Sequence, residues 1–350
     1  MSTHRNGSGI SAATPSRRGL LKVAAAGAVA LPFAGVASRL VAAPPPAAPT
    51  PAALKPLKLA WNTGAVCGAP VAVAKHNGFF EKHGLDVEFV NFAGTTEQLL
   101  EALATGKADI GHGMALRWLK PLEQGFDVRI IAGVHGGCMR LLAAKNGGIT
   151  SLAGLKGKTV AISDLSSPAK HLFSIQLAKQ GIDPNRDVEW RVFPGDLLAI
   201  AVDKGEAQAV AHWDPVTYNF LKSGTLVEIS TNLSGEFANR VCCVLGARGS
   251  LLREDKAAAA AVTRAVFEAQ HYAAANPVEA AKVYQQYSPK SSIEDLAAQL
   301  SSQTHDHNPV GADIKREIAL YAEELKGVQV FKQSTDAAKF ADRVYADVLG

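Results

Sequence analysis

The sequence has few cysteines, no long hydrophobic run and none of the common catalytic motifs. Its four cysteines are too few for a disulfide-rich scaffold, and they lack the paired spacing of zinc sites. It contains no GxSxG nucleophile elbow, no Walker loop and no HExxH motif. The sequence therefore predicts no catalytic residues, no cofactor and no metal site, and we expect a protein that is not an enzyme.

An excess of positive charge is also missing from most of the chain. The sequence has 36 basic and 32 acidic residues, a formal net charge of +4. Arg5, Arg17, Arg18 and Lys22 account for the difference, since residues 1–37 contain no acidic residue. No block of Lys and Arg interleaved with aromatics follows, so nucleic acid is not an expected partner.

The N-terminal region has the composition of an export signal. The segment SRRGLLK at residues 16–22 precedes the uncharged run Val23–Ala37, which is rich in Ala and Gly and contains Pro32. A membrane span needs about 20 consecutive apolar residues, more than this run provides. The adjacent arginines predict a twin-arginine signal over residues 1–37, followed by a Pro/Ala-rich tether over residues 38–56. No lipobox cysteine follows, so we expect a periplasmic protein that neither spans the membrane nor carries a lipid anchor.

The expected export route predicts the oxidation state of the thiols. A twin-arginine substrate folds before export, in a compartment that keeps thiols reduced. Cys242 and Cys243 lie in the run RVCCVLGA, which is typical of a buried strand, and small apolar core residues are their expected role. A bridge between Cys67 and Cys138, which both follow expected strands, is left open.

Short apolar stretches alternate with helix-like segments through most of the chain. Expected strands at residues 57–61, 85–92, 108–113 and 128–134 are separated by expected helices. The alternation begins again with strands at 158–163, 187–193, 207–213 and 226–230. Connections of a few residues in this order favour mostly parallel sheets covered by helices, and the chain from Glu254 onward is expected to be helical.

Two extended stretches, residues 138–145 and 240–247, join the two series. We therefore expect two α/β lobes connected by two strands. Lobe 1 comprises residues 57–140 and 245–350, including a helical C-terminal tail, and lobe 2 comprises residues 141–244. Ligands of open α/β sheets bind at the carboxyl ends of the strands, so an interlobe cleft is the expected binding site, and two hinges allow it to close.

Several segments resemble one known family in order and spacing. They are NGFFEKHGLDVEFV, ALATGKADIGHG, LAGLKGKTVAIS, GIDPNRDVEWRVF and AVDKGEAQAVAHWDPVTYNFLKSG. The chain from about Leu57 to Ala346 is similar to periplasmic substrate-binding proteins of ABC importers, within the nitrate/sulfonate/taurine (NMT1/THI5-like) group. The resemblance implies a type II periplasmic binding protein fold with mixed sheets and two hinge strands. It also implies a monomer that delivers a small solute to ABC permease and ATPase subunits.

In the resembling proteins the ligand contacts come from loops that follow strands. The matching loops here supply the candidate ligand-binding residues Asn62, Thr63, Gly64, Cys67, Thr95, His112, Met114, His135, Cys138, Ser166, Ser167, His171, Trp213 and Asp214. Ser166 and Ser167 precede Pro168 at an expected helix start and are the favoured anion cradle. Trp213 is an expected apolar wall or a core residue, and Asp214 is expected mainly to cap its helix. Arg140 is a candidate counter-charge or a solvent-facing residue.

Three hypotheses about the bound solute remain. A small anion such as a sulfonate or nitrate is the leading one, although the loops hold no clear pair of arginines. A pyrimidine or amine heterocycle is the alternative. Metal capture by His112, His135, His171 and His212 is less favoured, because no two of them have the spacing of paired ligands.

Overall fold

The computed structural model describes residues 53–92 and 96–350. The expected export signal, most of the tether and the candidate Thr95 lie outside these ranges. The chain from Pro51 to Gly350 forms one compact unit. None of the helices in the described ranges has the length and apolar character needed to cross a bilayer.

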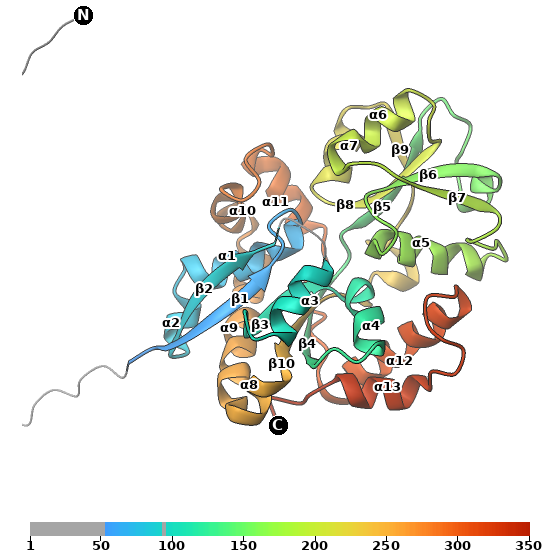
Figure 1. Ribbon diagram of the computed structural model, residues 1–350. Coiled ribbons are helices and arrows are strands. Elements are labelled where there is room, and N and C mark those ends of the chain that lie inside the picture. The colour runs from blue at the N-terminus through green and yellow to red at the C-terminus, as the bar shows by residue number, and fades with distance from the viewer. Residues whose placement is uncertain (1–52, 93–95) are drawn as a thin grey trace, which may run out of the picture. The chain divides into compact units, whose positions relative to one another are not determined.

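The first sheet has five strands in the order β2-β1-β3-β10-β4 (Figure 1). The strands are β1 (Lys55–Trp61), β2 (Leu85–Asn91), β3 (Ile110–Met114), β4 (Val128–Gly136) and β10 (Val241–Arg248). The connecting helices are η1 (Val66–Gly68), α1 (Ala69–His76), α2 (Phe79–Lys82), α3 (Thr96–Ala104) and α4 (Ala115–Glu123). β1 runs parallel to β2 and β3, whereas β10 is antiparallel to β3 and β4.

The second sheet repeats this plan in the order β7-β6-β8-β5-β9. Its strands are β5 (Met139–Ala144), β6 (Lys158–Ile162), β7 (Val188–Val192), β8 (Ala209–Trp213) and β9 (Leu226–Thr231). Its helical segments are η2 (Leu152–Leu155), α5 (Pro168–Lys179), η3 (Gly195–Leu197), α6 (Leu198–Asp203) and α7 (Val216–Lys222). β6 is parallel to β7 and β8, and β5 is antiparallel to β8 and β9. β5 enters the second sheet from the first, and β10 enters the first sheet from the second. Because both strands are antiparallel to their neighbours, both sheets are mixed, as predicted.

Two segments carry the chain between the sheets. The first is Gly137–Cys138, between β4 and β5, and the second, containing η4 (Gly235–Phe237), joins β9 to β10. Gly137 has φ +51°, and a Cβ there would lie 2.7 Å from Leu233 Cδ2, so glycine is required. The buried Asn232 ties the two segments together, because its Oδ1 accepts hydrogen bonds from the backbone N–H groups of Cys138 and Met139 at 3.0 and 2.7 Å. The residue boundaries of the two lobes stay a prediction.

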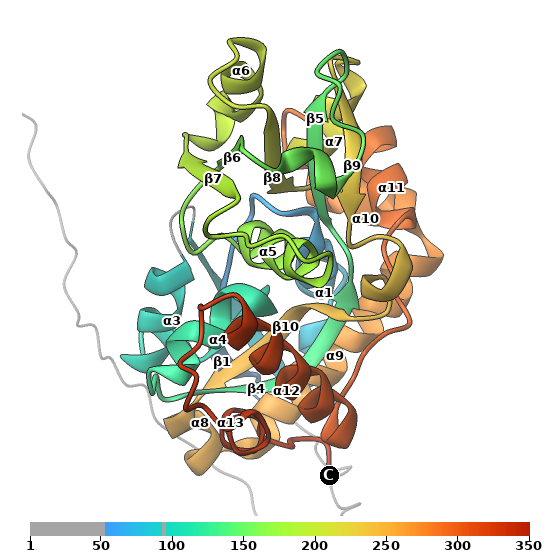
Figure 2. The ribbon, with the colours of Figure 1, turned by 90° about the vertical axis from the view of Figure 1, so that its right-hand side faces the viewer.

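The chain after β10 is helical, as expected (Figure 2). Its helices are α8 (Gly249–Glu254), α9 (Lys256–Ala275), α10 (Pro277–Gln285), α11 (Ile293–Ser301), α12 (Gly311–Gly327) and α13 (Ala337–Val344). The alanines of α9 allow close packing against α1 and α2, and the buried Trp61 and Tyr284 belong to the same hydrophobic cluster. α13 packs against β4. These helices stabilise the first sheet, and loops of that sheet contribute to the candidate site.

Candidate functional site

A pocket lies where the carboxyl ends of β1 and β3 meet the residues that follow β6 and β8. The space free of protein atoms at this pocket, including open solvent at its mouth, is about 410 Å³. It is lined by Asn62, Ala65, Cys67, Leu99, His112, Gly113, Met114, Arg117, Pro168 and Trp213. Only Pro168 and Trp213 come from the second sheet and its helices. The pocket therefore occupies the position at which open α/β sheets bind ligands.

Direct hydrogen bonds join the two sides of this pocket. The Trp213 indole Nε1–H donates to the carbonyl of Gly64 at 3.3 Å, and the N–H of Val66 donates to the carbonyl of Asp214 at 3.1 Å. The His171 Nδ1 bonds the carbonyl of Leu116 at 3.1 Å. These bonds connect loops of one sheet with loops of the other. The two lobes are therefore in contact around the pocket.

Arg117 is the charged residue of the pocket wall. Its side chain is buried, and Nη2 donates at 2.7 Å to Oδ2 of Asp164, which follows β6. The guanidinium lies 5.5 Å from the centre of the Trp213 ring, a cation–π arrangement. Within the described part of the chain, its Nε and Nη1 make no hydrogen bond. Arg117 was not predicted as a site residue from the sequence, although its position in the first turn of the helix after β3 could have indicated it.

Two helices begin beside the pocket without a side-chain cap. α4 starts after Met114, and α5 starts after Ser167 with Pro168 in its first turn. No side chain bonds the first N–H groups of either helix, of which Pro168 contributes none, and the helix dipole favours negative charge there. Ser167 is buried and its hydroxyl has no partner within the described residues, whereas the Ser166 hydroxyl donates to Asp164 at 2.9 Å.

His112, His171 and His212 are buried and neutral at pH 7. Burial lowers the pKa of His112 and of His171 to about 4, and that of His212 to about 3. His112 lines the pocket, and its Nε2 has no hydrogen-bond partner in the described chain. A neutral imidazole with a free ring nitrogen can donate to, or accept from, a bound solute.

The loop after β1 contributes backbone more than side chains. Asn62 lines the pocket, but its Oδ1 accepts the N–H of Gly64 at 2.7 Å in a tight turn. The Thr63 hydroxyl donates to Asn91 Oδ1 at 3.2 Å. Tyr284 donates its hydroxyl to the carbonyl of Thr63 at 2.6 Å, so this loop is fixed to α10.

Arg140 and Asp214 form a buried ion pair away from the pocket lining. Arg140 Nε donates to both carboxylate oxygens of Asp214 at 3.1 Å, and its Nη1 donates to Glu228 at 2.5 Å. Burial raises the pKa of Asp214 against the opposing effect of Arg140. Asp214 also accepts from the Thr217 hydroxyl and the Tyr218 N–H at the start of α7. The pair therefore has a structural role here, and Arg140 is not an available counter-charge.

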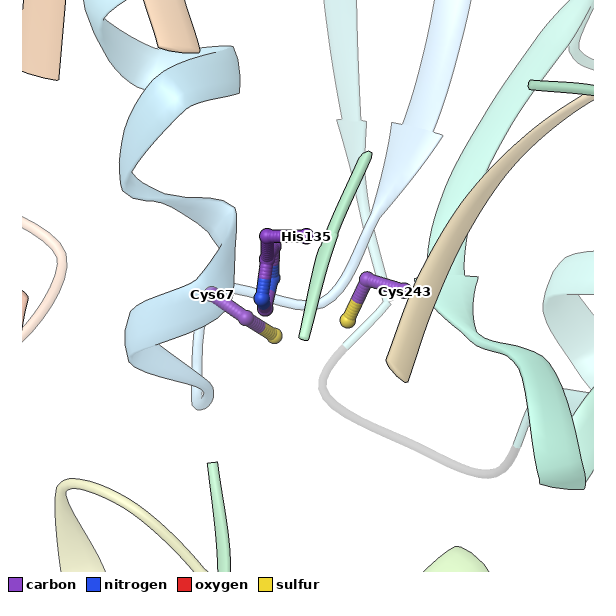
Figure 3. Close-up of side chains that lie close together, drawn as sticks. All are labelled: Cys67, His135 and Cys243. Carbon is purple, nitrogen blue, oxygen red and sulfur yellow. The ribbon is translucent and has the colours of Figure 1, made fainter. Parts of the chain in front are cut away.

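The four cysteines converge beside the pocket, which the sequence did not predict. All four are buried free thiols, so Cys67 and Cys138 form no bridge. Cys138 Sγ lies 3.6 Å from Cys242 Sγ, and Cys67, Cys243 and His135 bring their ligand atoms within 4.8 Å of one another (Figure 3). The thiols of Cys138 and Cys243 lower the pKa of Cys67, whereas burial raises that of Cys243. We call these four cysteines and His135 the thiol cluster.

The fold seen here is that of periplasmic binding proteins. It is similar to the aliphatic sulphonate binding protein SsuA of Escherichia coli (TM-score 0.71, 19% identity, 84% of this chain and 92% of that one). It is similar to the nitrate-binding protein NrtA of Synechocystis PCC 6803 (TM-score 0.69, 18% identity, 85% and 87%). A third similar structure is the ligand-binding component of an ABC-type import system from Staphylococcus aureus with zinc bound (TM-score 0.66, 15% identity, 84% and 97%).

The chain belongs to the NMT1/THI5-like family, whose model matches residues 68–280. Among curated proteins it is 26% identical over 215 residues to a binding protein of Brucella abortus, a match that covers 61% of this chain. The match spans about 65% of the length of that relative. The curated relative is named as a binding protein, and the similar structures are named as binding proteins or binding components.

Proposed function

We propose that the protein is the periplasmic solute-binding component of an ABC import system and captures a small anion in the pocket between its two sheets. The observation that carries this proposal is the buried Arg117, held in a pocket whose walls come from both sheets. Similar structures in this fold are described as sulfonate-, nitrate- and import-system binding components. Permease and ATPase subunits follow from the transport role.

Several donors of the pocket suit an anion such as a sulfonate or nitrate. Arg117 has guanidinium nitrogens left over from its bond to Asp164, and two uncapped helix starts face the same space. His112 offers a free ring nitrogen, and Trp213 supplies an apolar wall for a carbon portion. Asn62, Cys67, His112, Met114 and Trp213 are the predicted residues that we retain as solute contacts.

The lobes are proposed to close around the solute about the segments near Gly137 and Asn232. Hydrogen bonds such as Trp213 to Gly64 and the ion pair Arg117–Asp164 then form only in the closed state. Since a ligand shifts a two-state equilibrium by its differential affinity, a solute touching both sides stabilises the closed form. Release to a permease requires these same few bonds to break.

The test is solute binding by the purified chain, measured by thermal shift and calorimetry. The panel contains taurine, methanesulfonate, nitrate and bicarbonate, with a pyrimidine and a primary amine as the alternative cargo. We expect a sulfonate or nitrate to raise the melting temperature, to bind one-to-one and to be recovered unchanged. If only the pyrimidine or the amine raised the melting temperature, the anion assignment would be overturned, whereas the role as a solute-binding protein would stand.

Two matched variants separate charge recognition from lobe closure. Arg117→Gln removes the guanidinium and is expected to weaken anion affinity about tenfold or more, the loss typical of a charged hydrogen bond. Asp164→Asn weakens one contact of the closed state but leaves Arg117 charged and without its counter-charge, so the loss of anion affinity should be clearly smaller than in Arg117→Gln. Equal losses in both variants would show that the ion pair, and not the guanidinium, matters for binding.

A further inference from the structure

Three potential metal ligands from separate parts of the first sheet meet inside the thiol cluster. Cys67 lies in η1 after β1, His135 lies on β4, and Cys243 lies on β10. Their sulfur and nitrogen atoms all lie within 4.8 Å of one another, and the side chains point to a common centre (Figure 3). All three residues are at most 3% exposed.

His135 has the bonding pattern of a metal-binding imidazole. Its Nδ1 bonds the carbonyl of Gly136 at 2.7 Å, and since a carbonyl only accepts, Nδ1 carries the proton. In the neutral ring Nε2 then holds a free lone pair. This atom is buried and has no hydrogen-bond partner within residues 53–92 and 96–350. Metal-binding histidines are oriented in this way by a backbone carbonyl on the opposite ring nitrogen.

The surrounding fold holds the three ligands in place. Cys243 and His135 are directly paired residues of the adjacent strands β10 and β4. The turn that carries Cys67 is fixed by the Tyr284 hydroxyl, whose single proton is shared between the carbonyls of Thr63 and Ala65, at O–O distances of 2.6 and 2.7 Å. Ligands that are positioned by strands and a buried tyrosine need little reorganisation to bind an ion.

We propose that Cys67, His135 and Cys243 bind one thiophilic divalent metal ion of the zinc class. Two thiolates and a neutral imidazole give the ligand set a charge that a divalent cation balances, which favours such an ion in a buried site. The set contains sulfur and nitrogen and no carboxylate, so it disfavours magnesium and calcium.

The distances fit this assignment with a small adjustment. Zinc bonds of about 2.3 Å to sulfur and about 2.0 Å to nitrogen put tetrahedral ligand atoms roughly 3.5–3.8 Å apart. The observed spacing within 4.8 Å therefore needs a contraction of about an ångström or less, which side-chain rotation supplies. Cys67 also lines the solute pocket, so the ion lies in the wall of that pocket.

The experiment measures metal binding by the full chain, stripped of metal and kept reduced, with no organic solute present. Zinc affinity is obtained by competition with a chromophoric chelator, and cobalt or cadmium is added separately to detect thiolate-to-metal charge-transfer absorption. We expect one ion per chain and absorption corresponding to two thiolates. Because no solute is present, this result is independent of the anion test.

Neighbouring cysteines provide a matched pair of variants. Cys243→Ser is expected to weaken zinc binding by about a hundredfold or more, at least the loss that even outer-shell changes cause. Cys242→Ser changes the adjacent buried thiol, which lies outside the group of three, and should keep one-to-one binding. Circular dichroism of both variants verifies that they fold.

Specific outcomes would overturn the proposal. Wild-type protein without charge-transfer absorption in cobalt or cadmium excludes a thiolate site, whatever the variants do. Zinc binding that survives Cys243→Ser, or that is lost equally in Cys242→Ser, excludes the assigned ligands.

Discussion

At the scale of single residues, burial determines how the histidines behave. His171 shows this best, because it lies on α5 with its Nδ1 bonded to the carbonyl of Leu116 on α4. Burial is the main reason that its pKa falls to about 4, and the nearby Lys170 and Arg117 act in the same direction. The imidazole is thus a neutral contact between the two halves of the molecule.

This state predicts a loss of stability in mild acid. The pKa of His171 is about 4 in the folded chain and about 6.5 when unfolded, so between these values the unfolded state binds more protons. Stability from the neutral ring is complete above about pH 6.5 and is lost as the pH falls toward 4. His171 alone should lower the free energy of unfolding by about 2 kcal/mol between pH 7.5 and pH 5.

Urea denaturation at both pH values measures this effect. The His171→Asn variant should be less stable at pH 7.5 but should show a pH dependence about 2 kcal/mol smaller than wild type. The exposed His271 on α9 gives the control, His271→Asn, which should keep the wild-type dependence. An unchanged pH dependence in His171→Asn would contradict the assignment.

At the scale of elements, the segments that join the sheets determine the mixed topology. The strands and helices were predictable because apolar alternation, helix starts and glycine stops recur along the chain with short connections. Trp213 and Met114 were predictable as pocket residues because each is the last residue of a strand. The thiol cluster was not, since Cys67, Cys138 and Cys243 meet only after β10 inserts between β3 and β4. Sequence spacing carries no signal of that insertion.

The joining segments depend on one buried side chain, which gives the next prediction. Asn232→Ala leaves the N–H groups of Cys138 and Met139 without their acceptor, and each lost buried bond costs about 1–3 kcal/mol. We therefore expect a loss of about 2–6 kcal/mol in the free energy of unfolding, measured with urea. Asn232→Asp retains the accepting oxygen and should lose clearly less. If the two variants were equally stable, Asn232 would not tie the segments together.

At the scale of the whole molecule, the thiols and the proposed export route are connected. Cys138 and Cys242 lie with their sulfurs 3.6 Å apart, close enough to oxidise if the chain folded in an oxidising compartment. On the proposed route, folding in the cytosol would bury both thiols before export. Export of a folded chain is therefore consistent with four free buried cysteines, and it is the route that the adjacent Arg17 and Arg18 predict.

Replacing both arginines tests this route directly. The double variant Arg17→Lys, Arg18→Lys keeps the positive charge but removes the twin-arginine pair, so the protein should accumulate folded in the cytosol, as cell fractionation and immunoblotting would show. Arg5→Lys, also within residues 1–37 but outside the pair, should be exported normally. Periplasmic delivery of the double variant would instead indicate an export route for unfolded chains. In that case the buried thiols, and any ion they bind, would have to be protected from oxidation during folding outside the cytosol.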